Sequence, residues 1–250
     1  DIPSVTVVPD NMMSYQNTVT QSTTQSTTTQ STSTTPSLQE LQQDLLKNIV
    51  HGMKATYNIK SHEMFYKTDF SILSLAQTQN GSRYLQECVQ NSYQNDQFFT
   101  LLFESLYDNF HLLMIDLFGN YLVQTIINKA SISQVKRLTN HALLHFYDIA
   151  IDKQGSRSLH CLFNSMSQNM NTYMDALSHI LSQPMKFISL MKHNNGSHTI
   201  NNMLKVFPAS YLRPIYDLIL QYFYELVCDK FGLCVVKTFL SLSPKQYFIT

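Results

Sequence analysis

The amino-acid sequence predicts an all-α fold in which helical units stack into a solenoid behind a disordered N-terminal tail. Five of the six glycines recur at intervals of 38, 36, 41 and 36 residues. A nearly fixed period of this length is the signature of a repeat architecture. Apolar residues occupy the same offsets from each of these glycines, whereas the first 37 residues are poor in the large apolar groups that a folded core needs.

Each repeated glycine is followed by one apolar face of a predicted helix. The glycines are Gly81, Gly119, Gly155, Gly196 and Gly232. Offsets +4, +7 and +8 are apolar after every one of them, which is helical spacing and indicates a buried face. The residues at +4, which we expect to be buried, are Leu85, Val123, Leu159, Ile200 and Val236.

An apolar pair at offsets −6 and −5 predicts the end of a preceding helix. Each unit is therefore expected to be two helices with the glycine as the tight turn between them. A lone unit cannot bury both apolar faces, so the units must stack. The expected units, numbered one to five, span about 66–93, 94–130, 131–167, 168–207 and 208–243.

The repeat domain is expected to span residues 38–250, after a disordered tail at 1–37. Within this tail, Thr20–Thr35 is almost entirely Thr, Ser and Gln, which cannot bury enough surface to offset chain entropy. Ser37 and Glu40 have the form of a capping box, which predicts the first helix start. The chain begins at Asp1, and residues 244–250 resemble the opening of another unit, so we interpret the sequence as a fragment of a longer repeat array.

The composition excludes several classes of protein. No apolar run approaches the roughly 20 residues of a membrane span, and no secretory signal pattern is present. The four cysteines have neither disulfide-scaffold nor zinc-ligand spacing, so free thiols in a reducing compartment are expected. Lys plus Arg equal Asp plus Glu at 17 each, and two of the acids lie in the tail, which leaves 17 basic against 15 acidic residues elsewhere. This balance is less basic than a generic nucleic-acid binder.

Offsets +1, +2 and +5 share a second face of each glycine-led helix and predict a line of polar trios along the solenoid. Hydrogen-bonding groups beside an aromatic ring or a guanidinium plane can hold unstacked bases. The trios of units one to four are Ser82, Arg83 and Gln86; Asn120, Tyr121 and Gln124; Ser156, Arg157 and His160; and Ser197, His198 and Asn201. In unit five the same positions are Leu233, Cys234 and Lys237, of which Leu233 cannot hydrogen-bond a base.

The strings around these trios resemble repeats of the Pumilio (PUF) family. Asn80–Gln86 (NGSRYLQ) and Phe118–Gln124 (FGNYLVQ) resemble its first two repeats closely. Gln154–His160 and Asn195–Asn201 resemble degraded third and fourth repeats, and Asp229–Lys237 is the most distant. The resemblance covers roughly residues 60–243.

The resemblance implies a code of one base per repeat, in which +1 and +5 contact the base edge and +2 stacks between bases. Ser82 with Gln86 would then read adenine, and Asn120 with Gln124 would read uracil. Because family members bind RNA antiparallel to their repeats, these two units would read 5′-UA-3′. The resemblance further implies a monomeric, cytoplasmic, non-catalytic regulator of mRNA that acts through 3′ untranslated regions, with effector proteins of repression or decay as partners and no cofactor.

Two alternatives remain beside this hypothesis. The neutral charge and the altered +5 residues of units three to five favour a protein-interaction scaffold without RNA selectivity. An enzyme is not supported, because no hydrolase, nucleotide-binding or catalytic Cys-His motif is present. His141 and His145 have the i,i+4 spacing of zinc ligands, but no third ligand is evident from the sequence, so no metal site is expected.

Overall fold

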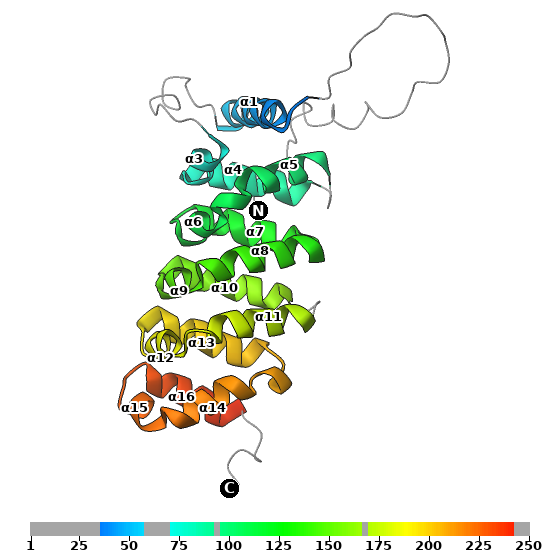
Figure 1. Ribbon diagram of the computed structural model, residues 1–250. Helices are drawn as coiled ribbons and strands as arrows, with labels where there is room; N and C mark the ends of the chain where they lie inside the picture. Colours follow the sequence, from blue (N-terminus) through cyan, green and yellow to red (C-terminus); the bar gives the residue numbers. More distant parts are fainter. Residues whose placement is uncertain (1–35, 58–70, 93–95, 167–169, 243–250) are drawn as a thin grey trace, which may run out of the picture.

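The protein is all-α in the regions that the structure describes. The computed structural model describes residues 36–57, 71–92, 96–166 and 170–242, and no β-strand occurs in these ranges (Figure 1). The predicted solenoid is confirmed. The predicted tail lies outside the described residues except for its last two positions.

Three kinds of helix repeat along the chain, not two. The helices that carry the glycines, here called the glycine helices, are α4 (Gln79–Asn91), α7 (Gly119–Lys129), α10 (Lys153–Ser165), α13 (Asn194–Val206) and α16 (Gly232–Leu242). Each follows a short helix, and these are α3 (Ile72–Ala76), α6 (Phe110–Ile115), α9 (Phe146–Ile151), α12 (Pro184–Met191) and α15 (Phe223–Val227). The remaining long helices, here called the outer helices, are α1 (Leu38–Tyr57), α5 (Gln97–Leu106), α8 (Ile132–Leu144), α11 (Met170–Leu181) and α14 (Arg213–Gln221).

The expectation of two helices per unit was wrong because the first helix is interrupted, and only in unit four does a proline, Pro184, mark the point at which the next helix begins. In unit three the interruption is His145 alone, which ends α8 and precedes α9 with φ −117° and ψ 18°. In unit two it is the 3₁₀ turn η2 (Tyr107–Asn109). A second 3₁₀ turn, η4 (Ala209–Tyr211), precedes α14.

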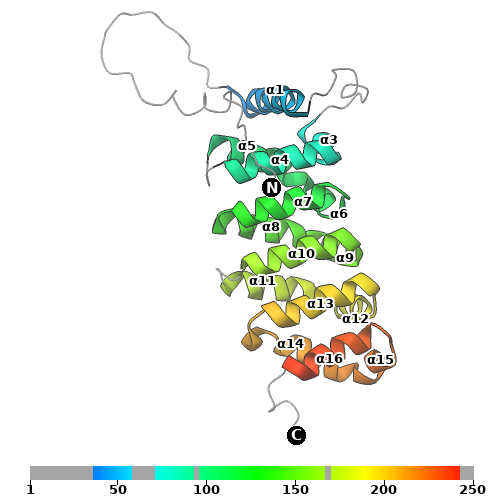
Figure 2. The ribbon, with the colours of Figure 1, turned by 180° about the vertical axis from the view of Figure 1, so that it is seen from behind.

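The helices of each kind stack into rows. Consecutive glycine helices pack against one another from α4 to α16, and Figure 2 views the molecule from their side. The outer helices form the facing row in Figure 1, where α8 packs against α11 and α1 packs against α5. Helix α1 therefore extends the outer row, and its start is confirmed by reciprocal hydrogen bonds between Ser37 and Glu40.

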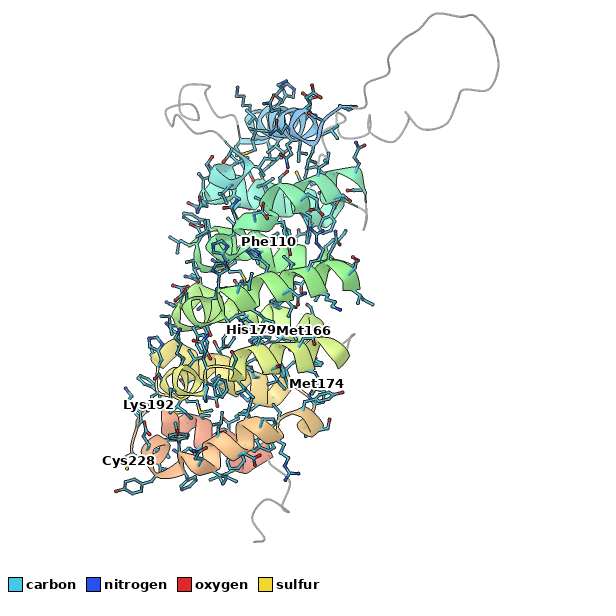
Figure 3. All side chains as sticks on the ribbon, viewed as in Figure 1. Phe110, Met166, Met174, His179, Lys192 and Cys228 are labelled. Carbon is cyan, nitrogen blue, oxygen red and sulfur yellow. The ribbon has the colours of Figure 1, made fainter. Side chains whose placement is uncertain are left out.

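The core lies between the rows and is built by the predicted columns (Figure 3). All five +4 residues are buried, as predicted, and so are all five at +7. The +8 residues are also buried except for Leu240, which is 48% exposed. Leu240 lies on α16, the last glycine helix of the described residues.

The glycines lie in the first turn of their helices, which differs from the expected turn position. Gly155 is the third residue of α10, and Gly232 is the first of α16. A Cβ on Gly232 would lie 2.6 Å from the carbonyl oxygen of Leu226, and one on Gly155 would overlap the carbonyl of Ile149. Glycine is thus needed for close approach to the end of the short helix rather than for a left-handed turn.

The first prediction tests this close approach. Gly155→Ala should destabilise the protein by about 1–3 kcal/mol, because the backbone carbonyl of Ile149 must shift to admit the methyl group. Asn164→Ala, at an exposed position of the same helix, should change stability by less than about 0.5 kcal/mol. Urea denaturation measures both. A Gly155→Ala protein as stable as wild type would contradict the conclusion that glycine is needed at this position for the close approach to Ile149.

Candidate nucleic-acid interface

The start of every glycine helix is held by a side chain three residues before the glycine. This side chain accepts a hydrogen bond from the glycine N–H, and the residues that do so are Thr78 (3.1 Å), Asp116 (2.7 Å), Asp152 (2.8 Å), His193 (3.3 Å) and Asp229 (2.8 Å). Side-chain acceptors of this kind satisfy N–H groups that have no partner within the helix. This column was not predicted from the sequence, although three of its five residues are aspartates at the same offset from the glycine.

The capped helix start places the predicted trio residues at different depths. The +2 side chains are exposed in all five units, and these are Arg83, Tyr121, Arg157, His198 and Cys234. The +1 residues lie beneath them. Ser82 is 2% exposed and Asn120 is 0% exposed, whereas Ser156 is half-buried. Each trio of units one to four therefore has a projecting +2 group above a polar +1 residue.

In units one and two, the +1 and +5 side chains are joined by a hydrogen bond. The Nε2 group of Gln86 donates to Oγ of Ser82 at 3.1 Å, and that of Gln124 donates to Oδ1 of Asn120 at 3.1 Å. Both glutamines are half-buried. A +1 and a +5 group thus meet at one place on each helix, as the edge of a single base would require.

The +1 side chains are themselves fixed by backbone carbonyls. Nδ2 of Asn120 donates to the carbonyls of Asp116 (2.8 Å) and Leu117 (2.9 Å). Oγ of Ser82 donates to the carbonyl of Phe118 in the next unit at 2.7 Å. These bonds hold the floor of the site, so the glutamine is the member of each pair with more freedom to meet a ligand.

Units three and four are arranged differently. Oγ of Ser156 receives a hydrogen bond from Oγ1 of Thr199 at 3.0 Å, which joins the two units. Oγ of Ser197 donates to the carbonyl of Asn194 at 2.9 Å, and Oδ1 of Asn201 is buried without a hydrogen-bond partner in the described structure. His160 is exposed. The structure does not bring +1 and +5 into a hydrogen-bonded pair in these two units.

Unit five offers a cation in place of a polar pair. Leu233 is half-buried, and Cys234 and Lys237 are exposed.

All four cysteines are free thiols, as expected. Burial raises the pKa of the Cys88 thiol to about 12 and that of Cys161 to about 11, which keeps both protonated near neutral pH.

Positive charge is concentrated on the glycine helices. Their one acidic residue is Glu87, which lies 3.5 Å from Arg83 in an exposed ion pair. Their basic residues are Arg83, Lys129, Lys153, Arg157, Lys205 and Lys237. The row that carries the trios is therefore basic although the whole chain is neutral. Such a row suits a polyanion.

Fold and site together define a helical-repeat protein that presents one trio per unit along a basic row. The model of the Pumilio-family RNA binding repeat matches residues 71–104, 109–141, 145–169, 186–220 and 222–247. The chain belongs to the Pumilio family. The matched repeats begin near the short helices, whereas units two to five, as expected from the sequence, begin with the outer helices.

Curated relatives match over about 70% of the chain. The suppressor protein MPT5 of Saccharomyces cerevisiae is 25% identical over 71% of this chain and 21% of its own length. Pumilio homolog 11 of Arabidopsis thaliana is 29% identical over 69% and 31%, and Fem-3 mRNA-binding factor 1 of Caenorhabditis elegans is 26% identical over 68% and 29%. The chain thus spans less than a third of each of these proteins.

Solved structures show the same architecture. The RNA-binding domain of yeast Puf5p bound to SMX2 RNA has a TM-score of 0.65 at 25% identity, covering 72% of this chain and 50% of its own. The Puf4 RNA binding domain bound to an HO endonuclease RNA 3′ UTR recognition sequence has a TM-score of 0.62 at 26% identity, covering 72% of this chain and 54% of its own.

No helix in the described part of this chain is long and apolar enough to cross a membrane.

The second prediction tests the capping column. Asp116→Ala should destabilise the protein by about 0.5–2 kcal/mol, because the N–H groups of Phe118 and Gly119 lose their acceptor. Asp116→Asn keeps an acceptor oxygen and should lose much less. Chemical denaturation compares the three proteins, and equal loss in the Ala and Asn variants would contradict the capping role.

Proposed function

We propose that this chain binds single-stranded RNA in a sequence-specific way through the trios of its glycine helices. The observation that carries the proposal is the hydrogen-bonded +1/+5 pair beneath an exposed +2 side chain in units one and two. This arrangement offers donors and acceptors to a base edge and a planar group to a base face. The basic row supports it by attracting the phosphate backbone.

Under this proposal, Ser82 and Gln86 read adenine beside Arg83, and Asn120 and Gln124 read uracil beside Tyr121. Ser156, Arg157 and His160 of unit three, and Ser197, His198 and Asn201 of unit four, complete the RNA-binding surface with weaker base discrimination. In these two units the described +1 and +5 side chains form no hydrogen-bonded pair, which leaves stacking on the exposed +2 groups as their main contribution.

The wider role follows from the family and its members. Fem-3 mRNA-binding factor 1 is named for the mRNA that it binds, and the Puf4 domain is bound to a 3′ UTR recognition sequence. We propose that this chain acts in the same manner, as a non-catalytic, monomeric, cytoplasmic regulator of mRNA that works with effector proteins. We assign residues 38–250 to the repeat domain and residues 1–37 to a separate tail.

A protein-interaction scaffold is the alternative that one observation favours. In units three to five no +1/+5 pair forms among the described residues, so a large part of the row lacks the reading chemistry. Selection of bound sequences from a random RNA pool separates the two functions. Enrichment of an element containing UA supports the regulator, whereas the absence of any enriched sequence supports the scaffold.

The third prediction concerns stacking by Tyr121, whose ring is 50% exposed. Stacking contributes about 1–3 kcal/mol per base, so Tyr121→Ala should weaken binding about tenfold to a hundredfold for every RNA that places a base there. Tyr224→Ala is the matched control, since Tyr224 is 83% exposed on the short helix α15. It should leave RNA affinity unchanged. Equal effects of the two substitutions would contradict the assigned surface.

The fourth prediction concerns the base edge. Asn120→Ser recreates in unit two the Ser/Gln pair of unit one, so preference at that base should shift from U toward A with little loss of total affinity. Stacking ignores base identity whereas edge contacts depend on it, so this variant and Tyr121→Ala must behave differently. Fluorescence anisotropy with matched U and A oligonucleotides measures the shift. Indifference of both wild type and variant to the base would refute sequence-specific reading.

A further inference from the structure

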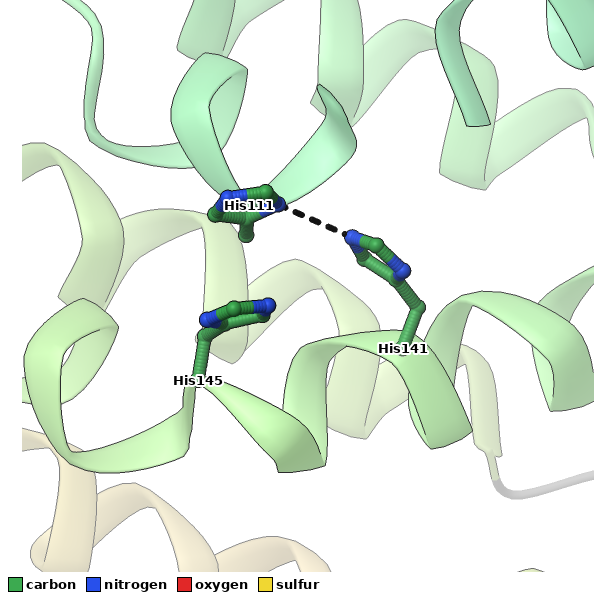
Figure 4. A group of neighbouring side chains, drawn as sticks. All are labelled: His111, His141 and His145. Carbon is green, nitrogen blue, oxygen red and sulfur yellow. Dashed lines mark hydrogen bonds between the residues drawn. The ribbon is translucent and has the colours of Figure 1, made fainter. Parts of the chain in front are cut away.

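Three histidines from two adjacent units meet away from the trios. His141 lies in the last turn of α8, and His145 is the residue that ends this helix. His111 is the second residue of α6 and projects toward them from the preceding unit (Figure 4). The sequence showed only His141 and His145 at the spacing of zinc ligands. His111 could not be added to them from the sequence, because it lies 30 residues before His141.

The ring nitrogens are close enough for one ion. One possible ligand atom from each histidine lies within 4.8 Å of the others. Nδ1 of His111 is 3.0 Å from Nε2 of His141, near the roughly 3.3 Å that separates two nitrogens on a tetrahedral zinc ion. The rings of His111 and His145 are stacked at 3.9 Å and 11°, so His145 must turn its ring to aim a nitrogen at the same point. All three residues are half-buried, which leaves the cluster reachable from solvent.

A cation beside the three histidines would oppose the binding of a positive ion. Arg137 lies one turn before His141 on α8, and its guanidinium forms two hydrogen bonds with Glu104 at 2.6 and 2.9 Å. The positive charge beside the cluster is therefore balanced.

We propose that His111, His141 and His145 form a binding site for a divalent transition-metal ion, with Zn²⁺ as the occupant. Imidazole nitrogens suit zinc, and a set of three leaves the fourth coordination position to water. The ion joins α6 of unit two to the end of α8 of unit three. It thus strengthens one interface of the stack, since units of a solenoid contact their neighbours only.

The test is zinc titration of tag-free, chelator-treated protein against a chromophoric chelator, with thermal unfolding as a second readout. One equivalent should bind and raise the Tm. His111→Gln, His141→Gln and His145→Gln should each weaken binding by at least about 100-fold, the upper end of what loss of a second-shell partner costs. His179→Gln, at an exposed position in the last turn of α11, is the matched control and should bind as wild type does.

Circular dichroism of each variant shows whether weaker binding comes from loss of a ligand or from loss of the fold. If one variant fails to fold, the other two still test the site. Cobalt(II) bound by the wild type should show the visible absorption of a low-coordinate site. Binding that persists in the folded variants, or no binding at one equivalent, overturns the proposal. The outcome is independent of RNA recognition, because the trios lie on the glycine helices α4, α7, α10 and α13 and the histidines lie on α6 and at the end of α8.

Discussion

The rest of the architecture depends on the contact between each glycine and the end of the short helix before it. With no side chain, the first turn of the glycine helix approaches the residue six positions upstream, and Gly232 in this way comes close to the carbonyl of Leu226. A side-chain cap on the glycine N–H then fixes the helix start. Because offsets +1, +2 and +5 are counted from this point, the same contact that packs the core also aims the recognition residues.

Features encoded within one unit were predictable from the sequence, and features that depend on a neighbouring unit were not. The buried columns and the shared face of the trios follow from helical periodicity, which is local. The depth of Ser82 was not predictable, because its hydroxyl is held by the carbonyl of Phe118, 36 residues later. The break at His145 was also missed, since no local breaker residue marks it.

The neutral charge of the chain is an average over rows of different character. Glu104, Asp148 and Glu225 lie on outer or short helices, whereas the glycine helices carry Glu87 as their one acid. The periodic structure separates the charges, which composition alone cannot show. Net charge was therefore a poor guide to this protein, and the charge of one face is the quantity relevant to RNA.

Polar groups near the trios of units three and four connect the two units. Thr199 bonds to Ser156, and Nδ2 of Asn195 donates to the carbonyl of Ile151 at 2.8 Å, so polar groups near the trios join these two units. In units one and two the corresponding contacts leave the glutamine free to meet a base. Interface stability and base reading thus compete for the same few polar atoms. Under the proposed function, the balance between them changes along the solenoid, and units one and two are the units that discriminate bases most strongly.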